Sequence, residues 1–309
     1  MTETRRHLHR LAGCIVWLAA LPVTLSAQDF TTYETVKNPA RYGTFWAAFY
    51  GRANELTAQT RAALPHHLDI PFGADPKQRL DVYLPVKAVK NAPVLLFLHG
   101  GGFKEGDRAH YGYVAAPYAK YGIITVVAGY RLASEAAHYP AQSDDTKAAM
   151  LWIHKNIAKF GGNPQVLFLS GHSVGATLAA DVSVDRSWMK QAGLSPGSIK
   201  GIAAISGDYD LGPGENVAYA PTTELEARAS PLRHINDPAP VALLAFGTKE
   251  GKMRDNADGM TAQLRAKGVK TTLITLEGED HKDTVLSFGT VDSTLSNAVL
   301  KMIEDAKGS

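Results

Sequence analysis

Short apolar runs alternate with longer amphipathic stretches along most of the chain. The runs are rich in Leu and β-branched residues, which predicts strands at 94–98, 123–128, 166–169, 199–205, 241–246 and 271–276. Apolar residues recur at helical spacing over 144–157, from 174 onward, over 257–267 and over 291–307. This alternation predicts an α/β fold, with a mostly parallel central sheet and helices on both faces. Ligands of such sheets bind beyond the carboxyl ends of the strands.

Two segments lie outside this alternation. Residues 28–65 are predicted to form an N-terminal helical segment, and for their aromatic-rich part, 42–50, packing against the main body is favoured over a substrate site. Residues 66–309 are predicted to form the main domain. Within it, the Pro-, Gly- and acid-rich stretch at about 208–240 is too long for a plain connection. We interpret this stretch as a small cap or rim, with a surface loop as the alternative.

The N-terminal residues 1–27 have the pattern of a secretory signal peptide. Three arginines precede an apolar run at 11–25, and Ser26 and Ala27 provide small residues for cleavage. The run is too short, and too soon followed by polar residues, for a convincing membrane span. We therefore expect an exported chain, periplasmic or secreted. Cys14, the only cysteine, lies inside this signal, so the mature chain would have no disulfide.

Composition and charge narrow the classes of partner. A chain of 309 residues with 45% hydrophobic content has ample material for a core. The net charge of +2, without a basic cluster beyond the N-terminus, argues against nucleic acid, and no stable membrane partner is expected. Neither H-E-x-x-H nor G-x-G-x-x-G occurs, so we expect no metal and no other cofactor. The oligomeric state is left open.

Two glycine-framed motifs follow predicted strands. Residues 171–175, Gly-His-Ser-Val-Gly, fit the nucleophile elbow G-x-S-x-G, which exposes a serine on a sharp strand-to-helix turn. Residues 99–103, His-Gly-Gly-Gly-Phe, fit the loop that donates backbone N–H groups to an oxyanion. Ser173 is therefore the candidate nucleophile. The candidate oxyanion donors are the amides of Gly101, Gly102 and Val174.

A serine nucleophile needs a general base, and the base needs an orienting carboxylate. His281 is the best base because it follows the last predicted strand, and the histidine comes last along the chain in hydrolases built on this elbow. Glu250, just after the penultimate predicted strand, is favoured as the acid. Asp255, and Asp208 or Asp210 after the strand before that, remain open as alternatives.

Two other histidines adjoin the motifs. His99 begins the glycine-rich loop and is expected to pack or form a hydrogen bond there. His172 precedes Ser173, and its side chain is expected to point elsewhere. Neither is therefore a candidate base.

The ordered motifs resemble those of the α/β-hydrolase superfamily, most closely the bacterial carboxylesterase and feruloyl-esterase-like group related to hormone-sensitive lipase. Besides the two glycine motifs, Gly-Tyr-Arg-Leu at 129–132, Tyr-Pro-Ala at 139–141 and Gly-Gly-Asn-Pro at 161–164 carry the resemblance. It covers roughly residues 66–306 and implies an α/β-hydrolase fold. It also implies structural rather than catalytic roles for Tyr130, Arg131 and Asp145.

The resemblance implies a serine carboxylesterase that works through an acyl-enzyme intermediate. Tyr209, Tyr219 and Leu225 in the predicted cap would provide apolar surface for a short-chain or aromatic ester, but not for a long lipid chain. An amide-bond hydrolase of the same fold, arylformamidase-like or an exopeptidase, is the first alternative, because one triad serves both bond types. A non-catalytic binding protein is the second.

Overall fold

The computed structural model describes residues 43–236 and 239–307, so the predicted signal peptide and Cys14 lie outside the described residues. Eight strands form one sheet in the order β1-β2-β4-β3-β5-β6-β7-β8. They are β1 (His66–Pro71), β2 (Arg79–Tyr83), β3 (Ala92–Leu98), β4 (Ile124–Ala128), β5 (Gly162–His172), β6 (Ile199–Ile205), β7 (Val241–Gly247) and β8 (Thr271–Leu276). The β1–β2 and β2–β4 pairs are antiparallel and the others parallel. The predicted α/β-hydrolase fold is confirmed.

Helices connect and cover these strands. They are α2 (Gly43–Ala63), α3 (Ala116–Ala119), α4 (Ala141–Asn156), α5 (Val174–Val184), α6 (Ser187–Gln191), α7 (Thr223–Arg228), α8 (Gly251–Ala266), α9 (His281–Phe288) and α10 (Thr294–Ala306). The stretch predicted as one helix from 291 is helical only from Thr294, because the Ser293 side chain caps α10. Helix α9, which begins at His281, was not predicted; its eight residues are too few for helical periodicity to show.

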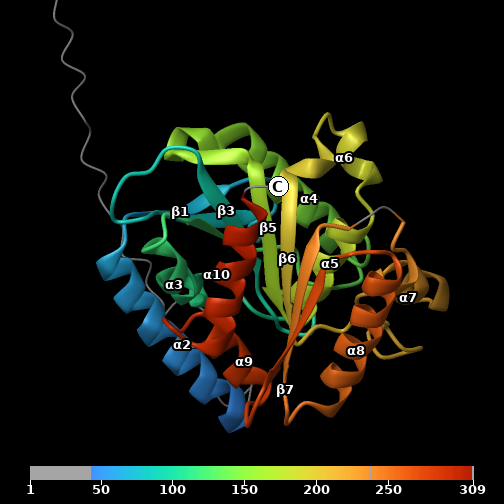
Figure 1. Ribbon diagram of the computed structural model, residues 1–309. Helices are drawn as coiled ribbons and strands as arrows, with labels where there is room; N and C mark the ends of the chain where they lie inside the picture. The colour runs from blue at the N-terminus through green and yellow to red at the C-terminus, as the bar shows by residue number, and fades with distance from the viewer. Residues whose placement is uncertain (1–42, 237–238, 308–309) are drawn as a thin grey trace, which may run out of the picture.

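The sheet separates two apolar core clusters. Along β3, Leu96 and Leu98 pack into one cluster, whereas Leu95 and Phe97 pack into the other. This two-sided burial is the reason that the strands are almost continuously apolar. Helices α4, α5 and α8 supply the first cluster, and α2, α9 and α10 supply the second, on the opposite side of the sheet (Figure 1).

Helix α2 packs against the main body, as predicted for the N-terminal segment. Phe49 and Tyr50 are buried in the second core cluster. Thr57 Oγ1 donates a hydrogen bond to the carbonyl of His110 at 2.9 Å. In Figure 1, α2 runs along the outside of the molecule.

The described part of 208–240 holds α7 and a short 3-10 turn at Pro231–Arg233. Tyr209 and Tyr219 are buried in the first core cluster, and the Tyr219 ring stacks on Phe103 at a centroid distance of 3.5 Å. The prediction that these tyrosines offer apolar surface to a substrate is therefore wrong, because both rings turn into the core. Leu225 is partly buried against the same cluster.

Candidate active site

Ser173 occupies the sharp turn between the end of β5 and the start of α5. Its φ is 55° and its ψ is −127°, a conformation that L-residues rarely adopt. A Cβ on Gly171 would lie 2.3 Å from the backbone of Gly175, and a Cβ on Gly175 would lie 2.2 Å from the carbonyl oxygen of Leu98. The close passage of the backbone therefore requires both framing glycines. It leaves the Ser173 side chain partly exposed on the turn.

The glycine-rich loop at 99–103, called the oxyanion loop below, lies beside this elbow, because the ends of β3 and β5 pair in register. Gly101 and Gly102 have φ values of +129° and +59°. Among the described residues, no hydrogen-bond acceptor faces the amides of these two glycines or of Val174. These N–H groups are therefore available to a negatively charged oxygen.

A partly buried ion pair anchors the chain just beyond the oxyanion loop. Lys77 Nζ donates to Asp107 Oδ2 at 2.8 Å and to the carbonyl of Gly106 at 3.4 Å. Asp107 Oδ1 accepts the amide of Ala109 at 3.0 Å. Burial by itself would raise the pKa of Asp107, but Lys77 and Arg108 outweigh it and lower this pKa to about 2. Asp107 is therefore ionised at neutral pH and holds this turn in place.

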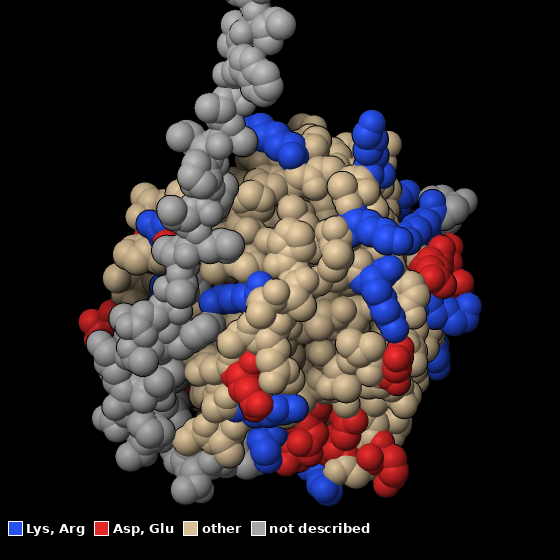
Figure 2. Space-filling model, turned by 90° about the vertical axis from the view of Figure 1, so that its left-hand side faces the viewer, with Lys and Arg blue, Asp and Glu red and all other residues tan. Residues whose placement is uncertain are grey.

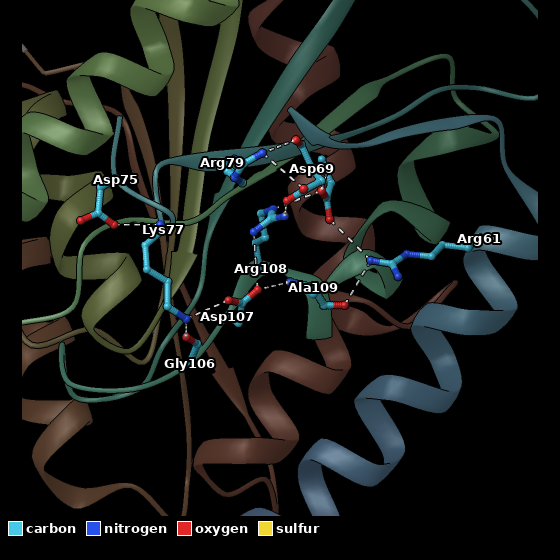
Figure 3. A network of polar contacts seen from close by, with 10 residues as sticks. Arg61, Asp69, Asp75, Lys77, Arg79, Gly106, Asp107, Arg108 and Ala109 are labelled. Carbon is cyan, nitrogen blue, oxygen red and sulfur yellow. Dashed lines mark hydrogen bonds and ion pairs between the residues drawn. The ribbon is translucent and has the colours of Figure 1, made fainter. Parts of the chain in front are cut away.

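The polar network extends from there to α2 (Figure 3). Arg108 Nε donates to Asp81 Oδ1 at 3.1 Å, and the other arm of Arg108 contacts Asp69. Arg61 of α2 reaches the other oxygen of Asp81 at 3.5 Å. Burial raises the pKa of the fully buried Asp81, against the opposing effect of Arg108. The network thus joins β1, β2, α2 and the segment that follows the oxyanion loop.

His281 and Glu250 meet at the carboxyl end of the sheet. His281 is the first residue of α9, and its Nδ1 donates a hydrogen bond to Glu250 Oε1, since a carboxylate only accepts. Glu250 Oε2 accepts the amide of Gly247 at 2.7 Å and the hydroxyl of Ser206 at 2.8 Å. The Glu250 side chain is 4% exposed. The two donors to Oε2 fix the carboxylate, so Oε1 stays directed at the imidazole.

The alternative acids lie elsewhere. Asp208 pairs with Lys252 at 2.9 Å, and Asp210 pairs with Arg233 at 2.5 Å. Asp255 is exposed on α8. The structure therefore brings Glu250, and none of these three, to the candidate base.

The His172 side chain is directed toward the site, so the prediction that it points elsewhere is wrong. Its Nε2 donates to the carbonyl oxygen of His281 at 2.7 Å, and the two ring centroids are 4.5 Å apart. Burial, followed by the neighbouring His281, lowers the pKa of His172 well below its usual value. The side chain is therefore neutral at neutral pH.

His99 packs and forms a hydrogen bond at the start of its loop, as predicted. Its ring stacks on Tyr130 with centroids 4.4 Å apart, and its Nδ1 donates to the carbonyl of Gly100 at 2.8 Å. Burial lowers the pKa of His99 to about 4. The Arg131–Asp145 ion pair, at 2.6 Å, also forms as expected for structural residues.

A cavity of about 690 Å³ contains both Ser173 and His281 in its wall. Trp46 and Tyr50 of α2 line it too, and the Trp46 ring packs edge-on against His281 with centroids 6.2 Å apart. The charged residues in the wall are Lys77, Lys104, Glu105 and Asp107. The aromatic-rich helix thus packs against the body and also borders the site. Trp46 and Tyr50 are four positions apart in the sequence, so they lie on the same face of the helix. This spacing was the sequence signal that one face of the helix could border the site.

Metal-type side-chain clusters and bilayer-spanning helices are both absent from the described ranges. No three or more His, Cys, Asp or Glu side chains there are grouped as a metal ion would require. None of the described helices combines the length and apolar character needed to cross a bilayer. Figure 2 shows lysine and arginine side chains interspersed with acidic ones on one face of the molecule.

The chain is similar in sequence to proteins named as esterases and formamidases. Residues 80–195 match the family BD-FAE. Kynurenine formamidase of Danio rerio is 26% identical over 80% of this chain and 85% of its own length. Esterase LipC of Mycobacterium tuberculosis is 34% identical, over 47% of this chain and 36% of its own length.

Solved structures share the fold. The carboxylesterase EstE1, cloned from a metagenomic library, superposes with a TM-score of 0.67 at 20% identity, covering 84% of this chain and 95% of its own. Esterase B from Lactobacillus rhamnosis superposes with a TM-score of 0.70 at 18% identity, covering 88% and 95%. At sequence identities of 20% and 18%, the structural similarity shows a shared fold.

Proposed function

We propose that this chain is a serine hydrolase of short-chain or aromatic carboxylic esters, in the carboxylesterase group of the α/β-hydrolase superfamily that is related to hormone-sensitive lipase. The observation that carries the proposal is the contact of His281 Nδ1 with a fixed Glu250 carboxylate, in a cavity that also contains Ser173. The similarity to named esterases supports the bond type.

The mechanism follows from these positions. His281 Nε2 accepts the proton of Ser173 as Oγ attacks the ester carbonyl carbon, and Glu250 stabilises the imidazolium. The amides of Gly101, Gly102 and Val174 hold the oxyanion. The imidazolium then returns the proton to the departing alkoxide, which leaves as the alcohol. Water repeats the sequence on the acyl-enzyme and releases the carboxylic acid.

The cavity wall supports the choice of substrate. Trp46 and Tyr50 offer aromatic surface to a flat acyl group or a short one. Lys77, Lys104 and Glu105 in the same wall carry charge, which a long alkyl chain would have to desolvate. We therefore expect C2 to C4 esters to be hydrolysed faster than C12 to C16 esters, and the reverse order in an acyl-length series would contradict this.

The test of the function is the variant Ser173→Ala. Its kcat with p-nitrophenyl acetate is expected to fall by about 10³-fold or more with the fold intact, because the nucleophile is lost. A fluorophosphonate probe should label the wild type at Ser173 and leave the variant unlabelled. Equal ester hydrolysis by the two proteins would refute the assignment. Absence of labelling in folded wild type would support a non-catalytic binding protein instead.

The second candidate function is amide hydrolysis. Similarity to kynurenine formamidases extends over 80% or more of the chain, further than the similarity to the named esterase LipC. The same nucleophile and base cleave anilides as well as esters. Kinetics on an ester and an anilide with the same acyl and aryl groups decide between the two functions. A higher kcat/KM for the anilide would favour the amide hydrolase, and the opposite ratio the esterase.

We also propose export to the periplasm or beyond, on the sequence pattern of residues 1–27. Expression of the full chain in a bacterial host, followed by fractionation and intact-mass measurement, tests this. The expected product begins at Gln28 and is found outside the cytoplasm. A product that retains residues 1–27 in the cytoplasm would contradict export.

A further inference from the structure

A side-chain hydrogen bond links the elbow directly to the helix that carries the base. His172 is the chain neighbour of Ser173, and its Nε2 donates to the backbone carbonyl of His281 at 2.7 Å. The two residues are 109 positions apart in the sequence. Both side chains line the catalytic cavity, and the His172 residue is 2% exposed.

We propose that His172 is a positioning residue, whose Nε2–H fixes the backbone of His281 relative to Ser173 and so sets the distance over which the serine proton moves. This role rests on the proposed serine-hydrolase function. Misplacing a reacting group by about 1 Å can cost about 100-fold in rate. A direct tie between the two segments therefore bears on kcat rather than on substrate binding.

The ring of His172 is confined from two sides. A Cβ on Gly100 would lie 3.0 Å from His172 Nδ1 and 3.2 Å from the Ser173 Cβ, so the oxyanion loop approaches as closely as a glycine allows. On the other side, the imidazole of His281 lies at a centroid distance of 4.5 Å. The ring thus fills the space between the oxyanion loop and the base, and it limits how far the base can swing.

His172 also keeps one protonation state. Its Nε2 must carry the proton, because a carbonyl oxygen only accepts. Burial and the neighbouring His281 disfavour a second proton by lowering the pKa of His172. The residue is therefore a neutral donor that adds no charge beside the imidazolium formed during catalysis.

The other side-chain donor to this carbonyl does not tie the two segments together. Thr284 Oγ1 donates to the His281 carbonyl at 3.0 Å, but Thr284 belongs to α9, as His281 does. That bond moves with the helix. Within the described chain, the hydrogen bond from His172 is the one that connects this carbonyl to the elbow.

A matched pair of variants isolates the hydrogen bond. In His172→Gln, the amide nitrogen ends as many bonds from Cα as Nε2 does, so a donor can still reach the carbonyl. His172→Met has similar length and no donor. Should His172→Met fail to fold, His172→Asn replaces it, because its shorter amide is polar but does not reach the carbonyl. His154→Met, at a partly exposed position of α4 outside the cavity, is the control.

The readout is kcat per active site, with the number of sites titrated by the fluorophosphonate, so that misfolded protein does not count. We expect His172→Met to lower kcat by about tenfold with KM within about twofold, and to slow labelling by the same factor. His172→Gln should regain most of the rate, and His154→Met should match the wild type.

The outcomes separate the positioning role from the function on which it rests. If His172→Met kept the wild-type kcat per titrated site, even with a lowered melting temperature, His172 would contribute to stability only and the positioning role would be wrong. Equally slow Gln and Met variants would also overturn the positioning role. A folded wild type that the probe does not label would instead overturn the proposed function itself.

Discussion

At the residue scale, the site accommodates a glutamate where hydrolases of this fold more often carry aspartate. The extra methylene is taken up by a tight turn, since Glu250 accepts the amide of Gly247, three residues earlier, at 2.7 Å. A Cβ on Gly247 would lie 2.3 Å from the carbonyl oxygen of Glu279. Only glycine lets the segments that carry acid and base approach this closely.

The fixed carboxylate makes Glu250→Gln an informative variant. The Gly247 amide and the Ser206 hydroxyl both donate to Oε2, so they select the amide oxygen for that position. The amide nitrogen must then face His281 Nδ1, which forces the wrong imidazole tautomer. We expect kcat to fall by about 10² to 10⁴-fold, with the melting temperature nearly unchanged. Steady-state kinetics and thermal unfolding measure the two quantities.

Asp255→Asn is the control for this variant, because Asp255 is exposed on α8. Its kcat should equal that of the wild type. A loss of activity in Asp255→Asn together with near-normal activity in Glu250→Gln would move the acid to Asp255.

The sequence predicted the residues that chain order and local motifs define. Ser173 lies in a five-residue pattern, and His281 and Glu250 follow strands at the expected places. Ser206 and His172 act through partners 44 and 109 positions away, and no local pattern encodes such contacts. The sequence therefore indicated which groups would meet, but not the contacts that hold them.

At the scale of elements, the apolar runs predicted the parallel strands because burial on both faces demands continuous hydrophobicity. The prediction failed for Tyr209 and Tyr219 of 208–240, which we expected to offer apolar surface to a substrate but which are buried in the core. The Tyr219 ring is buried against Phe103, which is distant in sequence and stacks on it. Periodicity alone could not separate a core ring from a substrate-binding ring.

Helix α2 supplies the aromatic side of the cavity, so its substitution should alter acyl preference. For Trp46→Leu, we expect the ratio of kcat/KM for methyl benzoate over methyl acetate to fall about three- to tenfold, because the aromatic contact is lost while the position stays apolar. Trp46→Phe should retain most of the ratio. An unchanged ratio in Trp46→Leu would place the aromatic acyl group elsewhere in the cavity.

At the scale of the whole molecule, the buried ion network couples parts that are distant in the chain. Arg61 of α2, Asp81 of β2 and Arg108 beyond the oxyanion loop share one cluster of charges (Figure 3). Such groups must remain paired, because an unpaired buried charge is strongly destabilising. The network therefore links the global stability of the fold to the position of the oxyanion loop.

Asp107 gives this coupling a measurable dependence on pH. Its pKa is about 2 in the folded protein, below the value of an unfolded aspartate, so its stabilising contribution is complete above the unfolded pKa and is lost as the pH falls through about 2. Asp107→Asn keeps an oxygen for the Ala109 amide but removes the charge opposite Lys77. We expect it to lower the free energy of unfolding by on the order of 2 kcal/mol at pH 7.

That difference between wild type and Asp107→Asn should persist from pH 7 to about pH 5 and shrink between about pH 4 and pH 2, because the wild-type carboxylate takes up a proton first in the unfolded chain and only near pH 2 in the folded protein. Urea unfolding across this pH range measures it, with Asp258→Asn, an exposed position of α8, as the control. Because the substitution also removes the negative charge that holds Lys77 in the cavity wall, ester hydrolysis by Asp107→Asn at pH 7 should be slower than in the control. A pH-independent stability difference would show that the lost charge is not its source.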